Sequence, residues 1–383
     1  MSARDAGGTE RFGSRPGKGD AEEGALHQEL NRGVLETILE ARDVTSLSVE
    51  ALVDLTREGI VDYLPDGIWQ VDPRNGDRIL FHSSRGRRPH DNAPEGDTDI
   101  PERPCAICEG RTTGIIDVAD LSEGFTFINK NLYPILYPFE KAGTAAGLHF
   151  LQWTSSQHEQ DWHNMILEDR VVVMERLAAL EETLLVGGDQ LPAAKGTNEA
   201  SDATRYVVII KNYGHLVGGS LIHGHQQIAF SNVMPRHFED NVRYEREHGE
   251  TFSAMMIRET SEALIVKDYG PALLVVPPFM RRPYDMMLLL KDVSKAYLHE
   301  LERAEVEAVA EGWHDAIGAI RKVMPSVGRE IAYNVVTNNG PGAGLYFDFL
   351  PYTQEIGGVE HLGLFVCQEL PEKAAEHLRE IVL

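Results

Sequence analysis

Two segments of this chain repeat one order of residues, and the repeat limits the folds open to the sequence. Residues 206–227 (YVVIIKNYGHLVGGSLIHGHQQ) and 331–352 (IAYNVVTNNGPGAGLYFDFLPY) each predict a strand, an Asn, a glycine-rich turn and a second strand. Each is preceded by an apolar, strand-like stretch and a long helical pattern: residues 125–137 and 167–185 before the first, and residues 263–276 and 298–323 before the second. A duplicated α+β unit with antiparallel sheets flanked by helices is predicted. The alternative is chance similarity between two glycine-rich strands.

The repeat divides the chain into three parts. Residues 1–33 mix Arg, Glu, Asp, Gly and Ser and predict a flexible polar tail, followed by a first half at 34–245 and a second at 246–383. Within the first half, helical periodicity covers residues 35–57. An Asn-Gly pair predicts a hairpin over residues 68–81.

The charge balance excludes some classes of partner. Against 36 Lys and Arg the chain has 60 Asp and Glu, a formal net charge of −24, and such a surface repels nucleic-acid phosphates and anionic bilayers. No apolar run reaches the roughly 20 residues of a membrane span, and none resembles a signal peptide. We therefore expect a cytoplasmic protein without nucleic-acid or membrane partners. An anionic small substrate would need a local cluster of cationic side chains and backbone N–H donors.

Three cysteines are too few for a disulfide framework. Cys105 and Cys108 form a CxxC pair, which in a reducing compartment indicates metal or redox chemistry. Cys367 stands alone in an apolar stretch (GLFVC) and is expected to be a buried strand residue.

The element that carries chemistry is GGSLIHGHQQ at residues 218–227. In an extended segment His223 and His225 point to one face, Gln227 follows on the same face, and the glycines let backbone N–H groups approach a ligand. Neutral imidazole is a competent nucleophile toward phosphorus and a common metal ligand. Two surface histidines would give the same spacing. In the second repeat residues 347–349 (FDF) replace His-Gly-His, so imidazoles are expected in the first half alone.

At this element the chain resembles galactose-1-phosphate uridylyltransferase and its relatives in the histidine-triad superfamily, whose motif runs Gly-x-Ser-x-x-His-Pro-His-x-Gln. Further matches keep the family's order over roughly residues 70 to 383. They are Asp72-Pro73 with Gly76, Arg85-Gly-Arg-Arg88-Pro89, Pro104-Cys105-Ala-Ile-Cys108, Phe127-Ile-Asn129-Lys130, Thr154-Ser-Ser-Gln-His158, Asn212-Tyr-Gly214, and Phe349-Leu-Pro351 with Glu360 and residues 370–375. The resemblance implies a duplicated histidine-triad-type unit.

A structural zinc ion is implied by the resemblance. Its ligands would be Cys105, Cys108, His158 and His223, a set that matches the tetrahedral sulfur and nitrogen coordination that zinc prefers. A redox CxxC and an exposed loop histidine at position 158 are the alternatives.

The resemblance makes His225 the catalytic nucleophile. It would attack the α-phosphorus of a nucleoside-diphosphate sugar, expel the sugar 1-phosphate and carry the nucleotide to a second sugar 1-phosphate. Its other ring nitrogen should bond a backbone carbonyl that fixes the tautomer. Gln227 matches the position that hydrogen-bonds the phosphoryl group, where related hydrolases have a third His.

The remaining family positions imply ligand contacts. The nucleotide and phosphate side is expected at Arg85, Arg88, Asn129, Asn212, Gly218, Gly219 and Ser220, and the sugar side at Glu360 and Gln354. Arginine forks suit bidentate phosphate contacts, although an Arg-rich loop can also be solvated surface, and each Asn or Ser can satisfy its own turn. The family commonly forms homodimers, so a homodimer is expected.

Three functions stay open on this sequence. The first is nucleotidyl transfer to a sugar 1-phosphate through His225. The second is a nucleotide-sugar or dinucleotide phosphorylase with inorganic phosphate as acceptor, and the third is a non-catalytic, zinc-stabilised nucleotide-binding protein. The family's second metal site, with its HxH in the second half, reads Tyr346-Phe347-Asp348 here, and the sugar-contacting stretch before Glu360 also differs. A second metal and a galactose substrate are therefore not expected.

Overall fold

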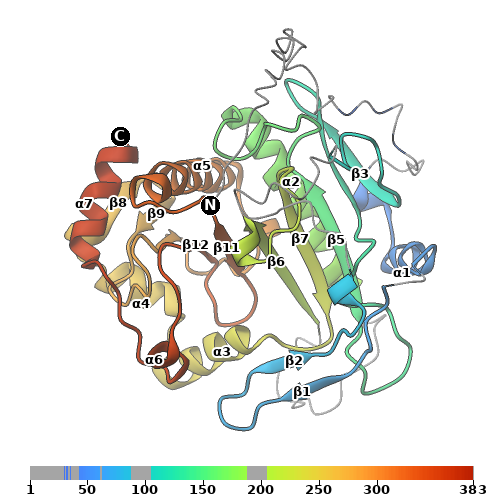
Figure 1. Cartoon of the computed structure of the whole chain (residues 1–383), viewed down its shortest axis with the longest axis horizontal. Coiled ribbons are helices and arrows are strands. Elements are labelled where there is room, and N and C mark those ends of the chain that lie inside the picture. The colour runs from blue at the N-terminus through green and yellow to red at the C-terminus, as the bar shows by residue number, and fades with distance from the viewer. Residues whose placement is uncertain are drawn as a thin grey trace, which may run out of the picture.

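In the computed structural model, residues 30, 32, 35, 43–60, 63–87, 105–187 and 205–382 are described. They form a two-stranded hairpin and one ten-stranded antiparallel sheet (Figure 1). The hairpin pairs β1 (Trp69–Val71) with β2 (Arg78–Leu80), and Gly76 turns between them with a φ of 78°, which confirms the hairpin predicted from the Asn-Gly pair. Among these residues no helix is both long and apolar enough to cross a bilayer.

The large sheet has the order β3-β4-β5-β7-β6-β11-β12-β10-β9-β8. Its strands are β3 (Ile115–Asp120), β4 (Phe125–Lys130), β5 (Gly147–Trp153), β6 (Tyr206–Tyr213), β7 (His225–Ser231), β8 (Ile265–Asp268), β9 (Ala272–Val275), β10 (Met286–Leu290), β11 (Tyr333–Asn338) and β12 (Tyr346–Pro351). The helices are α1 (Val49–Arg57), α2 (Leu167–Val186), α3 (Arg236–His248), α4 (Phe252–Glu259), α5 (Arg303–Ser326), α6 (Gly358–His361) and α7 (Pro371–Val382).

The strand order repeats. The first five strands lie in the order β3-β4-β5-β7-β6 and the second five in the order β8-β9-β10-β12-β11. Along the chain, the long helices α2 and α5 precede β6 and β11, respectively. This confirms the predicted α+β class and the antiparallel pairing. The two predicted sheets are joined into one because β6 pairs with β11. The residue at which one half passes into the other stays a prediction.

The register corrects two details of the predicted repeat. Gln227 pairs with Ile210, and Asp348 with Val336, while Ile210 and Val336 pair with each other across the centre. Asp348 is thus the counterpart of Gln227, and Tyr346 is the counterpart of His225. The expected replacement of His-Gly-His by residues 347–349 is wrong, because both phenylalanines of that segment face the helices. Likewise, the hairpin β8–β9 corresponds to β3–β4 rather than to residues 125–137.

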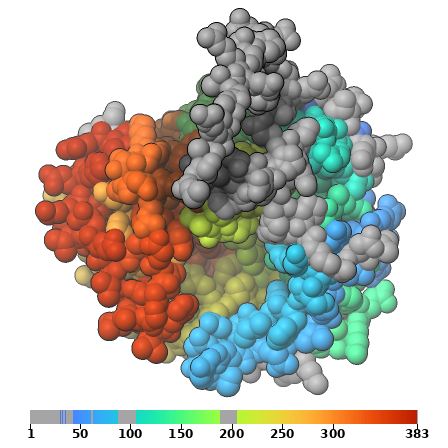
Figure 2. Space-filling view, viewed as in Figure 1, coloured from blue at the N-terminus to red at the C-terminus, as the bar shows by residue number. Residues whose placement is uncertain are grey.

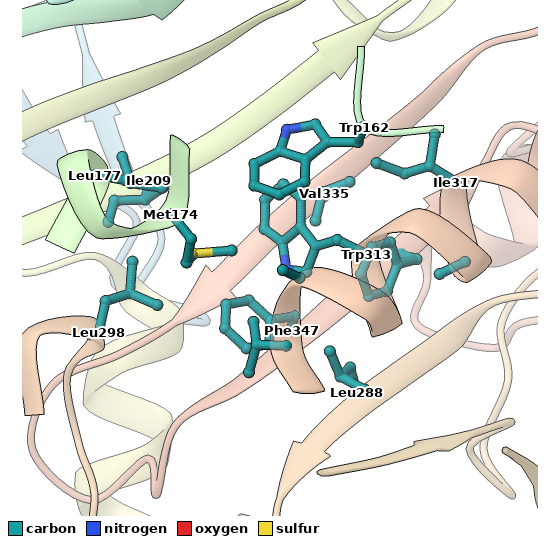
Figure 3. Packing of buried hydrophobic residues seen from close by; sticks show 14 of the residues in the cluster. Trp162, Met174, Leu177, Ile209, Leu288, Leu298, Trp313, Ile317, Val335 and Phe347 are labelled. Atoms are coloured by element: carbon teal, nitrogen blue, oxygen red, sulfur yellow. The ribbon is translucent and has the colours of Figure 1, made fainter. Parts of the chain in front are cut away.

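The core lies between the sheet and the helices α2 and α5. Trp162 and Trp313 pack against each other at a tilt, with ring centroids 4.8 Å apart, and Val335 and Phe347 contact this pair from the sheet (Figure 3). This one apolar layer continues under both halves, so the halves share a core and are held together by burial as well as by strand pairing.

Helix limits follow local chemistry. The predicted helix at 167–185 is observed as α2. Its first turn holds two acidic residues, whose negative charge is favourable beside the positive N-terminal end of the helix dipole. The predicted helix at 298–323 divides: Leu298–Glu300 is a 3₁₀ turn, and α5 begins only after Glu302, which caps it. Of the helix expected at 35–57, the described part is helical at Val49–Arg57. Cys367, expected in a strand, lies half-buried in a loop.

Candidate functional site

A cluster of four metal-binding side chains assembles in the first half. The ligand atoms of Cys105, Cys108, His158 and His223 all lie within 4.8 Å of one another. Nδ1 of His223 is 3.7 Å from Sγ of Cys105 and 3.6 Å from Sγ of Cys108, and Nδ1 of His158 is 3.5 Å from the Cys108 sulfur. Zinc bonds of about 2.3 Å to sulfur and about 2.0 Å to nitrogen give tetrahedral edges of about 3.5 Å. The donors and their spacing therefore fit zinc.

Neighbouring groups prepare the cluster for a cation. Nε2 of His223 donates to the backbone oxygen of Ser155 at 2.8 Å, which leaves Nδ1, the atom facing the sulfurs, with its lone pair. The Cys108 thiol, with the two imidazoles, lowers the pKa of the Cys105 thiol well below its usual range. A thiolate and a lone-pair imidazole are the forms in which these groups bind zinc.

His225 is held as a neutral base beside this cluster. Its Nδ1 lies 2.8 Å from the backbone oxygen of His223 and donates to it, so the lone pair belongs to Nε2, as the sequence predicted. Burial, followed by the nearby charge of Lys211, lowers the pKa of His225 to about 4. Within the described part of the chain no hydrogen-bond partner is found for Nε2. The ring is therefore chemically suited to act as a nucleophile.

The strand starts later than the sequence suggested. Residues 221–224 bend, and β7 begins at His225. The two imidazoles meet the Trp153 indole at different angles: the His223 ring at 89° with centroids 5.4 Å apart, and the His225 ring at 38° with centroids 5.0 Å apart. His223 is part of the metal cluster, whereas the His225 ring is held by the His223 carbonyl. Gln227, two residues along β7, lies on the same strand face as His225.

Two glycines make this arrangement possible. A Cβ at Gly224 would lie 2.7 Å from Cγ of Asp161, so a larger residue between the histidines would displace that carboxylate. A Cβ at Gly219 would lie 2.8 Å from the backbone nitrogen and oxygen of Gly214, where the loop folds back on itself. Close packing at both positions, rather than loop mobility, explains the absence of side chains.

A buried ion pair, which sequence reasoning missed, supports the nucleophile from the helix side. Nζ of Lys211 lies 2.7 Å from Oδ2 of Asp161 and donates to the backbone oxygen of His225 at 3.3 Å. Both side chains are buried. The signal in the sequence was a single Lys inside the otherwise apolar run YVVIIK, on the same side as Val207 and Ile209.

Replacing Lys211 by Met should destabilise the protein by about 3–5 kcal/mol, because it leaves the Asp161 carboxylate buried without a partner. Urea denaturation measures this change. Lys211→Met combined with Asp161→Asn should recover part of the loss. The control is Lys267→Met, whose partner Asp315 forms a half-exposed pair and should cost about 1 kcal/mol or less. Equal effects at the two lysines would contradict a supporting role for the buried pair.

The lowered pKa of His225 also predicts a pH profile. An imidazole with the ordinary value of 6.5 would be only about one-tenth neutral at pH 5.5, whereas one at about 4 is almost entirely neutral there. The active form is the deprotonated one, so the nucleotidylation rate should be flat from about pH 5.5 to 8 and fall as the pH drops through about 4. Single-turnover kinetics measures this. An inflection near 6.5 assigned to His225 would show that the ring is not desolvated.

The described members of the predicted phosphate-binding set, apart from the two asparagines, lie in two places. Gly218, Gly219 and Ser220 form the loop ahead of β7, and Arg85 begins a 3₁₀ turn after the hairpin, where its Nη1 donates to the backbone oxygen of Tyr133 at 3.4 Å. Arg88 lies outside the described residues. Figure 2 shows the yellow-green middle of the chain recessed between the red C-terminal segment and the blue and cyan N-terminal segments. The phosphate contacts stay predictions.

The two predicted asparagines differ in their surroundings. Asn129 is buried, with its oxygen accepting from Nε1 of Trp153 at 2.8 Å and its nitrogen donating to Oγ1 of Thr112 at 2.6 Å. It therefore fixes the indole against which both imidazoles pack. Asn212 is half-buried at the end of β6, and its oxygen accepts from Nδ2 of Asn334 on β11 at 2.7 Å. A nucleotide contact of either residue stays a prediction, and at Asn129 a ligand would compete with these bonds.

The predicted sugar-side residues bond their own loop. Gln354 is buried, donates from Nε2 to the backbone oxygen of Val366 at 2.7 Å and accepts from the Gln368 N–H at 3.2 Å. The Glu360 carboxylate accepts from the Gly357 N–H at 2.9 Å, as a cap of α6. Within the described residues these two side chains organise the C-terminal loop, and their contact with a sugar stays a prediction.

Known proteins with a similar sequence or fold match over most of this chain. No protein-family model matches the chain. A curated relative, ADP-glucose phosphorylase from Arabidopsis thaliana, is 23% identical over 347 residues, which cover 82% of this chain and 92% of the relative. A solved uridylyltransferase structure matches with a TM-score of 0.63 and 20% identity over 82% of this chain and 98% of that one. An Arabidopsis thaliana ADP-glucose phosphorylase with bound ADP-glucose matches with a TM-score of 0.60 and 17% identity over 82% and 99%. The two structures share the fold.

Proposed function

The chain belongs to the galactose-1-phosphate uridylyltransferase-like family of the histidine-triad superfamily, and from this premise we propose that it moves a nucleotidyl group from a nucleoside-diphosphate sugar to a phosphate acceptor through His225. The observation that carries the proposal is the state of that ring: buried, neutral, and with Nδ1 bonded to the His223 carbonyl. A histidine prepared in this way has its lone pair on Nε2.

In the first step, Nε2 of His225 bonds to the α-phosphorus of the donor. The bond from that phosphorus to the bridging oxygen breaks, and the sugar 1-phosphate leaves with the electron pair. The Nδ1 proton stays in its bond to the His223 carbonyl, so the positive charge that develops on the ring is stabilised without proton transfer. Gln227 and the N–H groups of residues 218–220 are the proposed donors to the phosphoryl oxygens.

In the second step, an oxygen of the acceptor phosphate attacks the same phosphorus and the bond to Nε2 breaks. With inorganic phosphate the product is a nucleoside diphosphate, and with a sugar 1-phosphate it is a new nucleotide sugar. We favour inorganic phosphate, because the relative that matches over 92% of its length is an ADP-glucose phosphorylase.

The proposed zinc acts structurally. It would be held by Cys105, Cys108, His158 and His223. By fixing His223, it would also fix the orientation of His225, two residues further along the chain. His223 does two things: its ring faces the metal cluster and its carbonyl fixes the nucleophile. A displacement of His223 in the cluster would therefore change the position of Nε2 of His225, because the His223 carbonyl holds that ring.

An exchange experiment separates the open functions. Labelled glucose 1-phosphate is incubated with ADP-glucose or UDP-glucose and the protein, without phosphate. Both catalytic hypotheses predict that label enters the matching nucleotide sugar, because the first step is reversible. Adding inorganic phosphate should then yield ADP or UDP if the chain is a phosphorylase, and one of several sugar 1-phosphates other than glucose 1-phosphate should yield a new nucleotide sugar if it is a transferase. Binding of the nucleotide sugars without exchange would instead indicate a non-catalytic protein.

A further inference from the structure

A cavity of about 630 Å³ lies in the second half of the molecule, away from His225 and Gln227. Its wall is formed by α3 and α4, the strands β10, β11 and β12, and the loop around residues 277–281. In Figure 1, α3 and α4 lie on one side of these strands and α5 on the other. A volume between about 300 and 1,000 Å³ is typical of small-molecule sites. Nothing in the reaction proposed above uses this cavity.

The cavity occupies the counterpart of the nucleophile's position. Tyr346 and Asp348 line it, and the strand register makes them the equivalents of His225 and Gln227. Gln227 and Asp348 lie on one face of the sheet, three strand steps apart through Ile210. Three steps of about 4.8 Å separate them by about 14 Å. The two positions are thus distinct sites on one surface.

No reactive group takes the place of the nucleophile. The Tyr346 phenol is fully buried, lies 3.2 Å from Nε2 of His237 and donates to Oδ1 of Asn241 at 3.3 Å. Burial holds its pKa well above the usual value, so it stays a phenol. Among the described residues, three or more candidate metal ligands converge only at the cluster of Cys105. A ligand here would bind without covalent chemistry and without a metal.

Aromatic rings form one wall. Phe252 lies with its ring centroid 5.3 Å from that of Tyr346 and 6.0 Å from that of Phe279, and Tyr244 packs on its edge at 5.8 Å. Phe279 is 52% exposed, which is unusual for a phenylalanine in a folded chain. A half-exposed ring over a partly open cavity offers a face on which a flat heterocycle can stack.

The opposite wall offers a carboxyl group, and the rim carries an exposed guanidinium group. Oδ2 of Asp348 accepts from Nδ2 of Asn338 at 2.8 Å, and burial raises the pKa of this carboxyl group. Its oxygens can accept from an amino group of a ligand. At the rim, Arg281 is exposed and forms no ion pair with the described residues; its guanidinium lies 4.8 Å from the ring centroid of Phe365. The other rim arginine, Arg243, is paired with Asp240.

We propose that this cavity is a second, non-reactive nucleotide site, which binds a nucleoside 5′-monophosphate with the base stacked on the exposed face of Phe279, its polar edge on Asp348 and its phosphate on Arg281. A nucleobase is a flat ring with hydrogen-bond donors and acceptors at its edge. The flat ring matches the aromatic wall, and the polar edge matches the Asp348 carboxyl group. The single phosphate matches the single unpaired guanidinium. The site stands on these contacts and does not depend on the reaction at His225.

Photolabelling of the metal-loaded full chain with 8-azido-AMP tests the site directly. We expect saturable labelling on peptides within residues 244–252 or 277–287, which excess AMP prevents. Arg281→Gln should raise the half-saturating concentration at least about tenfold, and Phe279→Ala should lower the labelling by a similar factor. The matched control is Arg258→Gln, an exposed arginine of α4 that is paired with Glu250 and does not line the cavity. It should label like the wild type.

Three results would overturn the proposal. They are label confined to the first half of the chain, labelling that does not saturate, and equal behaviour of the Arg281 and Arg258 variants. Protection by adenosine as strong as that by AMP would remove the phosphate from the proposal, since Arg281 would then contribute nothing. Because His225→Ala should leave this labelling unchanged, failure here is separate from failure of the reaction proposed for His225.

Discussion

Replacement of His225 by Ala should lower the rate of nucleotidyl transfer by a factor on the order of 10⁴ to 10⁶, the loss seen when a covalent nucleophile is removed from other enzymes. The reason is that no second imidazole can take its place: His223 has Nδ1 directed at the cysteine sulfurs and Nε2 bonded to Ser155. Steady-state turnover of a nucleotide sugar with phosphate measures the effect.

A matched control distinguishes loss of the nucleophile from loss of a histidine in general. His248 is exposed at the end of α3, and His248→Ala should keep the wild-type rate. The fold of the His225 variant should also survive, since the ring contributes one hydrogen bond and packing on Trp153. A His225→Ala protein that is folded and turns over within tenfold of the wild type would exclude the covalent route.

Replacement of Cys105 by Ser should lower the melting temperature by on the order of 10 °C and abolish the retention of zinc. Structural zinc contributes apparent binding free energies of about 10–16 kcal/mol in small zinc-binding peptides, whereas whole domains are stable by about 5–15 kcal/mol. Loss of one of four ligands is therefore expected to remove a large share of the stability. Differential scanning calorimetry together with metal analysis measures both quantities, and the wild type should contain about one equivalent of zinc.

Cys367 provides the control for this experiment. It is half-buried in a loop away from the metal cluster, so Cys367→Ser should retain the metal and shift the melting temperature by only a degree or two. A wild-type protein that binds no zinc yet melts like its Cys105→Ser variant would contradict the metal assignment. Activity lost in Cys105→Ser should follow from the movement of His223, whose carbonyl positions His225.

The sequence predicts the local parts of this site from the residues alone, whereas the meeting of the CxxC pair with His158 and His223 was implied by the family resemblance. The CxxC pair and the His-Gly-His segment each place their side chains through a few neighbouring residues, and the hydrogen bond from His225 to the carbonyl of His223 closes within three residues. The predicted and observed limits of an element agree for the same reason wherever one periodic pattern covers the whole element, as in α2.

Apart from the metal cluster, contacts between distant segments were the part that the sequence did not reveal. Lys211 and Asp161 are separated by the long helix α2, and nothing in either local pattern indicates that they form a buried pair. Asn129 matched a ligand position, but whether an amide faces a ligand or Trp153 depends on how β4 and β5 pair. The joining of the two halves by β6 and β11 is likewise a non-local pairing.

The direct test of the central claim is mass spectrometry of the intact protein after incubation with ADP-glucose or UDP-glucose in the absence of any acceptor. We predict a mass increase equal to one nucleotidyl group, located by fragmentation on His225 and released when inorganic phosphate is added. A protein that exchanges or consumes the nucleotide sugar while its mass is unchanged, or whose modification maps to a different residue, would contradict the account.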